Sequence, residues 1–334
     1  MKGLLRLALA GLLALTATGV ARAEEPLKAK VGVLRLSSSA PVFIAQDKGY
    51  FRDAGLDIDL KFFDAAQPIA VATTSGDVDF GVTAFTAGLY NLAGKSTLKV
   101  IGGMSREKQG FPLIGYFASN KAYEAGLKTP KDLAGKRVAV TQVGSSFHYS
   151  LGLLADKYGF KLSDVKVLPL QSLSNAAAAL KGETVDAALL PASTARPLME
   201  SGGAKLLGWV GDETPWQLGA VFASPKTVAN KALVTKFLAA LERADREYHG
   251  VILSAIKDGK APIDDRTKPL LAIIAKYTDL PIEQVIGNCA YIDPDGKLDV
   301  ENVDNQIKWL QQQGFVDKGF DADAIIAKDF VKPD

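Results

Sequence analysis

The chain has very little of the chemistry that builds metal centres and disulfides. Among its 334 residues there is one cysteine, Cys289, and there are two histidines. A single cysteine can form no internal disulfide, and one cysteine with two histidines falls short of the four ligands of a structural zinc site. We therefore expect stability to rest on core packing. Cys289, in an apolar-leaning stretch, is expected to be a buried structural thiol.

Several motifs of catalysis and nucleotide binding are also missing. The sequence has no Gly-rich phosphate loop of the P-loop or dinucleotide type and no G-x-S-x-G nucleophile elbow. No histidine stands with a serine and an acid in a recognisable order. Asp77, Asp79 and Asp186 lie beside short apolar strands, a position typical of turn and strand-end residues. We expect no cofactor and no enzymatic activity.

A long hydrophobic run occurs only at the amino terminus. Lys2 and Arg6 precede an apolar run over residues 7–20, and Ala21-Arg22-Ala23 fits a small-residue cleavage site. The run is too short for a membrane span and no stop-transfer pattern follows, so residues 1–23 are predicted to be a signal peptide. Their removal lowers the net charge from +2 by three units to −1. This balance leaves no basic excess for nucleic acid or an anionic membrane.

What the sequence does contain is an internal repeat with a spacing of 107 residues. Residues 30–39 (KVGVLRLSSS) align without gaps on residues 137–146 (RVAVTQVGSS), and residues 75–81 are answered by residues 181–187. Asp79 and Asp186 are again 107 residues apart. Each copy predicts a strand, a Ser-rich loop, a helix, a strand, a helix and a short strand, which indicates parallel βαβ units.

The repeat predicts an α/β protein with two lobes joined by two crossovers. We expect the crossings near residues 105–112 and 211–215. The segment after the second crossing is predicted to be helical over 232–248, 269–277, 282–286 and 300–313 and to pack on the first lobe. The predicted bounds are 24–108 with 216–334 for lobe 1 and 109–215 for lobe 2.

The Ser-rich loops are the strongest candidates for ligand contacts. Each loop follows a strand and opens a helix, so it combines hydroxyl groups with free backbone N–H groups and a partial positive charge. In parallel sheets, ligands bind beyond the carboxyl ends of strands. Equivalent loops after the short strands, at 83–86 and 190–194, should face the same cleft. We expect ligand contacts from Ser38, Ser39, Gln67, Phe85, Thr86, Arg106, Gln142, Ser145, Ser146, His148, Pro191 and Trp216.

Each of these residue types also has a structural explanation. Serine is a common N-cap, Phe85 fits a core position, and Arg106 could be a solvated or structural arginine. His148, at a helix start, is expected to be neutral whether it contacts a ligand or not. Trp209 and Trp216 flank the second crossing and could pack the hinge instead of lining the cleft. Arg35 could point toward the cleft or remain solvated.

The motifs together resemble a family of exported solute-binding proteins of ABC importers. The resemblance rests on the signal peptide, on residues 49–56 (GYFRDAGL), on residues 75–81 (SGDVDFG) and on residues 133–140 (LAGKRVAV). The subgroup it resembles binds taurine, aliphatic sulfonates, nitrate or thiamin-pyrimidine precursors. Residues 145–151 (SSFHYSL) resemble the second-lobe ligand loop of the taurine binders, and residues 280–288 are also similar to that group.

The resemblance implies a two-lobe periplasmic-binding-protein fold, type II-like, that closes by hinge bending. It implies a monomer that captures a small organic anion, a sulfonate or carboxylate, and delivers it to the transmembrane subunits of an ABC permease. Sulfonate binders tend to carry a tryptophan where this chain has Leu190-Pro191-Ala192. That leaves room for a bulkier, aromatic ligand, which Phe85, Phe111, Phe117, Phe147 and the two tryptophans could contact.

Other functions on the same fold stay open at this point. The chain could bind a thiamin-pyrimidine precursor or a nitrate-like solute. An enzyme resembling the pyrimidine-precursor synthases would be expected to be intracellular and to carry a cysteine-rich segment, which the predicted signal peptide and the single cysteine oppose. A periplasmic sensor module would need a signalling partner.

The signal peptide gives the first testable prediction. We expect the exported protein to begin at Glu24, because Ala21 and Ala23 place small residues where signal peptidase requires them. Amino-terminal sequencing of the protein recovered from the periplasmic fraction measures this directly. A cytoplasmic protein with an intact Met1 would contradict the prediction and the function that depends on export.

Overall fold

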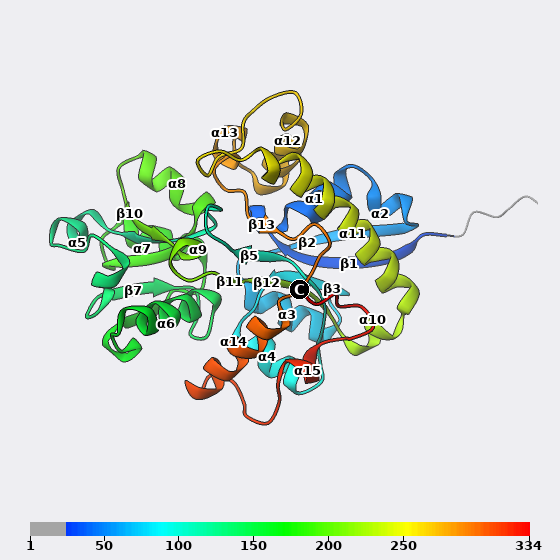
Figure 1. Ribbon diagram of the computed structural model, residues 1–334, viewed down its shortest axis with the longest axis horizontal. Helices are drawn as coiled ribbons and strands as arrows, with labels where there is room; N and C mark the ends of the chain where they lie inside the picture. Colours follow the sequence, from blue (N-terminus) through cyan, green and yellow to red (C-terminus); the bar gives the residue numbers. More distant parts are fainter. Residues whose placement is uncertain (1–24) are drawn as a thin grey trace, which may run out of the picture.

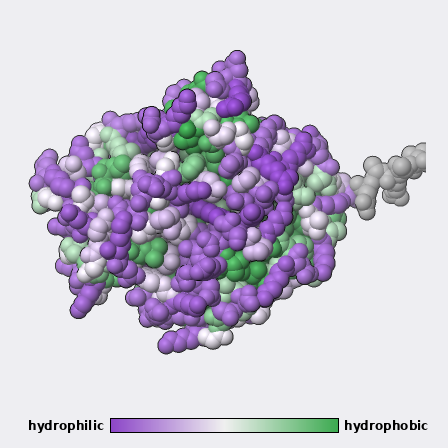
Figure 2. Space-filling view, viewed as in Figure 1, coloured by the Kyte–Doolittle hydropathy of each residue, from purple (hydrophilic) through white to green (hydrophobic). Residues whose placement is uncertain are grey.

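The computed structural model describes residues 25–334, so the predicted signal peptide lies outside the described residues. The chain forms two α/β lobes, each built on a five-stranded sheet, with a short three-stranded sheet between them (Figure 1). The face shown in Figure 2 is mostly hydrophilic, with small separated hydrophobic areas. Within residues 25–334, no helix is long and apolar enough to cross a bilayer.

The first sheet has the strand order β2-β1-β3-β12-β4. Its strands are β1 (Leu27–Leu34), β2 (Leu56–Phe63), β3 (Phe80–Ala84), β4 (Lys99–Gly103) and β12 (Gly219–Ala223). Its helices are α1 (Ala40–Asp47), α2 (Tyr50–Asp53), α3 (Ala66–Ser75), α4 (Ala87–Gly94), α10 (Pro225–Ala229), α11 (Lys231–Val251), α12 (Lys268–Thr278), α13 (Ile282–Val285), α14 (Val300–Gln312) and α15 (Ala322–Ile325). The four helices predicted over 232–248, 269–277, 282–286 and 300–313 are confirmed to within three residues as α11, α12, α13 and α14.

The second sheet repeats this order as β8-β7-β9-β6-β10. Its strands are β6 (Ile114–Ala118), β7 (Arg137–Val140), β8 (Lys166–Pro169), β9 (Ala187–Pro191) and β10 (Lys205–Trp209). Its helices are α5 (Asn120–Glu124), α6 (Ser146–Tyr158), α7 (Leu173–Lys181), α8 (Ala192–Glu200) and α9 (Val210–Glu213). Short 3-10 turns occur at η1 (Ser37–Ser39), η2 (Pro130–Leu133), η3 (Leu162–Asp164) and η4 (Leu253–Ala255).

The sequence repeat is reproduced in the register of the strands. Val31 pairs with Phe80 in the first sheet, and Val138 pairs with Ala187 in the second, each residue being 107 positions from its counterpart. The carboxylate of Asp79 accepts from the backbone N–H of Lys30 at 2.8 Å. The carboxylate of Asp186 does the same for Arg137 at 2.8 Å. Both aspartates therefore fix where two strands meet, as the sequence predicts.

Each sheet also contains an antiparallel strand that the parallel βαβ interpretation missed. β12 runs antiparallel to β3 and β4, and β6 runs antiparallel to β9 and β10. Both β12 and β6 follow a crossing, and every residue in them is buried. The expectation of purely parallel units was wrong because each strand enters its sheet directly from the other lobe, without the helix that a parallel connection requires.

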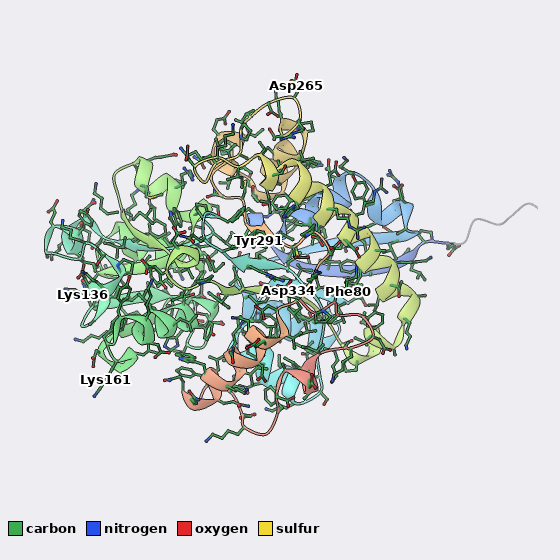
Figure 3. The ribbon with its side chains drawn as sticks, viewed as in Figure 1. Phe80, Lys136, Lys161, Asp265, Tyr291 and Asp334 are labelled. Carbon is green, nitrogen blue, oxygen red and sulfur yellow. The ribbon has the colours of Figure 1, made fainter. Side chains whose placement is uncertain are left out.

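The two crossings are hydrogen-bonded to each other instead of being separate loops. β5 (Ser105–Glu107) pairs antiparallel with β11 (Trp216–Gln217) on one side and with β13 (Tyr291–Ile292) on the other. Figure 3 places Tyr291 and Asp334 near the middle of the molecule, between the lobes. The polar loops expected at 105–112 and 211–215 are thus partly a ladder strand and partly the short helix α9. The exact bounds of the lobes remain a prediction.

The carboxyl-terminal helices pack on the first lobe, as expected. α11 lies along α1 and α2, and the ring of Phe237 stacks on Phe51 and Phe80 with centroids 5.2 and 4.1 Å apart. Cys289 is buried in this lobe, and burial raises the pKa of its thiol to about 12. The thiol therefore stays protonated at neutral pH, which fits the predicted structural role.

Helix α14 departs from the expectation because it also reaches the second lobe. The indole of Trp309 lies against Gly152 in α6, and its Nε1 donates to Asp156 at 3.0 Å. On its other side, α14 contacts α4 through Gln306, whose Oε1 accepts from the Tyr90 hydroxyl at 2.8 Å. α14 therefore bridges the lobes at the lower side of Figure 1.

The close approach of α14 to α6 predicts that adding a methyl group at Gly152 destabilises the protein. A Cβ at Gly152 would stand 1.9 Å from a ring carbon of Trp309. Gly152→Ala should lower the free energy of unfolding by about 1–3 kcal/mol, because the indole must move. Gly250→Ala is the control: Gly250 lies in α11 with nothing within 4 Å, so alanine should be neutral or stabilise by about 0.4–1 kcal/mol. Chemical denaturation measures both; equal stability of the two variants would contradict this packing.

Candidate functional site

A cavity lies between the two lobes, with about 630 Å³ of open space that is partly continuous with solvent. In β1, β3, β7 and β9 the lining begins at or next to the carboxyl end of the strand, whereas β12 and β6 contribute from their amino ends. The lining consists of Leu34, Leu36, Ser38, Ala65, Ala66, Gln67, Thr83, Ala84, Thr86, Ser105, Leu113, Ile114, Thr141, Gln142, Ser145, Ser146, Phe147, Leu173, Pro191 and Leu218. This is where ligands bind in open α/β sheets.

Helices from both lobes begin at the cavity wall. The first residues or N-caps of α3, α4, α6, α7 and α8 belong to the lining. The first turn of a helix exposes backbone N–H groups and carries a partial positive charge. The N-cap positions of α3 and α8 are Ala65 and Pro191, which have no side chain that could accept from those N–H groups. The wall is therefore rich in hydrogen-bond donors.

The amide of Gln67 is oriented by a hydrogen bond to Thr86. The Thr86 hydroxyl donates to Gln67 Oε1 at 2.6 Å and accepts from the backbone N–H of Leu89 at 3.0 Å. Gly88 permits this contact, since a Cβ there would stand 2.3 Å from the Gln67 amide. Because Oε1 is occupied, the NH₂ group of Gln67 is the part of the amide left to act on a ligand.

Thr83 contributes a hydroxyl that has no partner in the protein. Its side chain belongs to the cavity lining, the residue is only 8% exposed, and within residues 25–334 no group is hydrogen-bonded to its Oγ1. A buried hydroxyl without a partner is unfavourable by about 1–3 kcal/mol. A ligand that accepts a hydrogen bond from Thr83 would remove this penalty.

A direct contact between the lobes closes one side of the cavity. The backbone N–H of Ala87, in α4, donates to the carbonyl of Gly144 at 2.8 Å. Gly144 has φ +74°, and a Cβ there would stand 2.6 Å from the Cβ of Ala87. The N–H of Gly144 in turn donates to Nδ1 of His148 at 3.0 Å. We call this chain from Ala87 through Gly144 to His148 the latch.

Seven of the predicted site residues line the cavity, and the remaining five do not. Those in the lining are Ser38, Gln67, Thr86, Gln142, Ser145, Ser146 and Pro191. Ser145 also caps α6, because its hydroxyl accepts from the His148 N–H. None of these placements shows a bound ligand, so ligand contact at each remains a prediction.

Three of the five residues outside the lining are buried in contacts near it. Ser39 is the N-cap of α1, Phe85 stacks on Tyr90 with centroids 5.1 Å apart, and His148 belongs to the latch. His148 also packs on Phe315, with ring centroids 4.9 Å apart. The structural explanations considered for Phe85 and His148 apply here.

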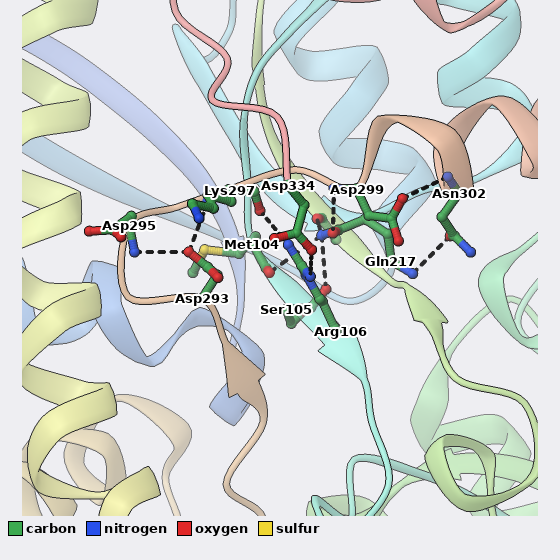
Figure 4. A network of polar contacts seen from close by, with 11 residues as sticks. Met104, Ser105, Arg106, Gln217, Asp293, Asp295, Lys297, Asp299, Asn302 and Asp334 are labelled. Carbon is green, nitrogen blue, oxygen red and sulfur yellow. Dashed lines mark hydrogen bonds and ion pairs between the residues drawn. The ribbon is translucent and has the colours of Figure 1, made fainter.

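Arg106 and Trp216 lie in the three-stranded sheet β11-β5-β13, called the hinge ladder below because we expect the lobes to rotate there, and they do not line the cavity. Arg106 forms an ion pair with Asp334, Nη1 to Oδ2 at 2.5 Å, and donates to the carbonyl of Lys297 (Figure 4). Trp216 packs edge-on against Tyr149, with centroids 4.8 Å apart. Among the aromatic residues expected to surround a bulky ligand, only Phe147 reaches the lining.

Sequence reasoning overlooked part of the lining on both sides of the hinge. Leu113, Ile114 and Leu218 stand where the crossings enter β6 and β12, and Thr141 follows β7 directly. The sequence signal for these residues was the short apolar run that follows each crossing. Each run could have been predicted as a strand whose first residues face the cleft.

A second hollow of about 610 Å³ adjoins the cavity and shares Leu34, Leu36 and Leu173 with it. Its wall includes Arg35 and Asp64. The Arg35 guanidinium lies 3.8 Å above the ring of Phe62 and donates to the carbonyl of Tyr277 at 3.1 Å. Charge in the cleft is therefore found in this adjoining hollow, where Arg35 is already held by its neighbours.

The latch predicts a pH dependence of stability. Nδ1 of His148 can accept from Gly144 only when the imidazole is neutral, and burial lowers the pKa of His148 below its ordinary value. The contribution of His148 is therefore complete above about pH 6.5 and is lost as the pH falls toward the lowered pKa.

The difference in melting temperature between pH 7.5 and pH 5 should be smaller in His148→Asn than in the wild type. His249→Asn controls for the loss of a histidine elsewhere. An unchanged difference in His148→Asn would contradict the role of the neutral imidazole.

Among the curated relatives of this chain is a protein named for solute binding. The chain is 30% identical over 175 residues to the taurine-binding periplasmic protein of Escherichia coli (strain K12), an alignment covering 52% of this chain and 51% of that protein. The chain thus spans about half the length of the curated relatives it matches.

Solved structures match nearly the whole chain. The alkanesulfonate-binding protein SsuA of Xanthomonas axonopodis pv. citri, bound to MOPS, superposes with a TM-score of 0.71 at 22% identity, covering 93% of this chain and 100% of that one. The nitrate-binding protein NrtA of Synechocystis PCC 6803 gives 0.70 at 14%, covering 92% and 87%. These likenesses establish the periplasmic-binding-protein fold. The NMT1/THI5-like family model matches residues 37–249, well over half of the chain, and the protein belongs to that family.

Proposed function

We propose that this protein is the solute-binding component of an ABC importer and that it carries a small organic anion in the cavity between its lobes. The observation that carries the proposal is the donor-rich wall, to which helix N-termini and hydroxyl groups of both lobes contribute. An anion offers the acceptors that such a wall requires. The relative named a taurine-binding periplasmic protein and the neighbour named an alkanesulfonate-binding protein support the same class of ligand.

The apolar part of the lining favours an organic anion over an inorganic one. Leu34, Leu36, Leu113, Ile114 and Leu218 surround the polar groups of the cavity. Pockets for small organic molecules are lined mostly by apolar side chains in this way, with a few polar groups among them. A nitrate ion would bury none of the apolar wall. The ligand is therefore a molecule with a carbon skeleton and an anionic group.

The two-lobe construction supports delivery to a permease. The lobes can rotate about the hinge ladder. Away from the ladder, three contacts join the lobes: the latch, α14, and a hydrogen bond at 3.0 Å from Arg196 to the carbonyl of Gly287. Ligand capture closes the lobes, and the permease subunits recognise the closed form. The predicted export places the protein in the periplasm, as a monomer that needs no cofactor.

Binding to small anions tests the proposal directly. We suggest a thermal-shift screen with sulfonates, carboxylates, nitrate and pyrimidines. An organic anion should raise the melting temperature, because a ligand that binds only the native state stabilises that state. Absence of any shift with organic anions would contradict the proposal, and a shift with a pyrimidine alone would replace the ligand class.

Serine variants connect the binding to this cavity. Ser38→Ala and Ser146→Ala should each reduce affinity at least about tenfold, since a hydrogen bond to a charged ligand contributes about 1.5–3 kcal/mol. Neither hydroxyl caps a helix, so the melting temperature of the free protein should change little. Isothermal calorimetry measures the affinity.

Ser119→Ala is the matched control for these variants. Ser119 caps α5, outside the cavity lining, and its hydroxyl accepts from the Ala122 N–H at 3.2 Å. Loss of this cap should lower the free energy of unfolding by about 1 kcal/mol and leave the affinity for the anion unchanged. Wild-type affinity in both Ser38→Ala and Ser146→Ala would show that the ligand lies elsewhere.

A further inference from the structure

We infer that the cavity selects a singly charged anion with an apolar body and rejects ligands that carry an ammonium group. The inference rests on the proposed function and narrows its ligand class. It excludes zwitterions such as amino acids and amino sulfonates, although a relative of this chain is named for taurine binding.

The first observation is that the cavity wall is electrically neutral. Within residues 25–334, the lining contains no aspartate, glutamate, lysine, arginine or histidine. The charged residues of the cleft, Arg35 and Asp64, line the adjoining hollow. An ammonium group in the cavity would therefore be buried without a carboxylate, and an unpaired buried charge is strongly unfavourable. One ring, Phe147, does not form the aromatic cage that could replace a carboxylate.

The second observation is that the polar groups of the wall are set to donate. The oxygen of the Gln67 amide already accepts from Thr86, which leaves its NH₂ group for the ligand. The buried hydroxyl of Thr83 has no partner within the described residues and can donate to a ligand oxygen. Backbone N–H groups at the uncapped start of α3 add further donors. Each of these groups can donate to an oxygen atom of an anionic group.

The third observation limits the number of charges. Helix N-termini and neutral donors stabilise one negative charge, but the wall has no lysine or arginine to balance a second. The remainder of the wall, Leu34, Leu36, Leu113, Ile114, Phe147, Leu173 and Leu218, can take only an apolar body. The wall therefore limits the net charge of the ligand to −1. It does not determine the length of the ligand's carbon chain or the type of its anionic group.

Two matched pairs of probes test the selection. 1-Propanesulfonate and taurine have the same number of heavy atoms and differ by a methyl group in place of an ammonium group. 3-Phenylpropionate and phenylalanine differ by the addition of an ammonium group. With calorimetry on the full mature protein, we expect the zwitterion to bind at least tenfold more weakly in any pair whose anion binds.

The outcomes distinguish this inference from the proposed function. If a zwitterion binds as tightly as its anion, the selection is wrong and the function as an anion carrier stands. Tight binding of 1,2-ethanedisulfonate would likewise overturn the limit to one charge. If no sulfonate or carboxylate probe binds or stabilises the protein, both the proposed function and the inference fail.

Gln67→Glu tests the donor role inside the cavity. A glutamate oxygen can still accept from Thr86, while the NH₂ donor is replaced by a carboxylate oxygen. The variant should bind the preferred anion at least tenfold more weakly. The ratio of its affinities for the anion and for the matched zwitterion should also be smaller than in the wild type. Gln313→Glu makes the same charge change at an exposed position after α14 and should bind as the wild type does. Wild-type affinity in Gln67→Glu would overturn the donor role.

Thr83→Val should raise the melting temperature and weaken binding, a combination that misfolding of the variant cannot produce. Valine replaces the unpartnered hydroxyl by a methyl group in a buried strand, so the free protein should melt at a higher temperature. The same variant should bind the anion several-fold more weakly. A raised melting temperature with unchanged affinity would overturn the contact between Thr83 and the ligand.

Discussion

The pairing of the two crossings in one antiparallel ladder is the constraint on which the site depends. Gln217, 1% exposed, holds this ladder together. Its Nε2 donates to the carbonyl of Gly219 at 2.8 Å, and its own N–H and carbonyl bond to Asn302 and Gln306 of α14 (Figure 4). The crossings and α14 are thereby joined, so the carboxyl ends of both sheets face the same cleft. Burial also raises the pKa of Glu107 in this ladder well above its usual range, which disfavours a negative charge in the hinge.

The duplicated βαβ unit explains why the cavity has two similar walls. Asp79 and Asp186 set the same strand register in each lobe, and a Ser-rich turn follows the equivalent strands β1 and β7. Once the hinge turns these units toward each other, helix N-termini approach the cavity from both sides. Neither lobe alone would enclose a ligand, since each supplies only its own half of the wall.

Sequence reasoning reached the parts of this arrangement that depend on local pattern. The repeat fixes β1, β7 and the aspartates because strand starts, serine-rich turns and apolar alternation are short-range features. It missed β6 and β12 because their partners are determined by the crossings. For Arg106 and His148 the sequence left both a ligand contact and a structural role open, because their partners Asp334 and Phe315 come from the distant carboxyl-terminal segment. Which polar residues are already occupied is a property of tertiary packing and cannot be predicted from spacing.

On the proposed function, the same occupied contacts would couple closure of the lobes to the ligand. The Ala87 N–H bonds to Gly144, so this donor of α4 serves the latch. The hydroxyl of Thr83 is buried without a partner. The cavity wall therefore carries an unfavourable polar group, and on the proposed function an anion would relieve it by accepting from it. A ligand shifts a conformational equilibrium only by its differential affinity for the two states. On the proposed function, that difference would arise where a buried donor meets an acceptor oxygen, and an apolar molecule of the same size would not supply it.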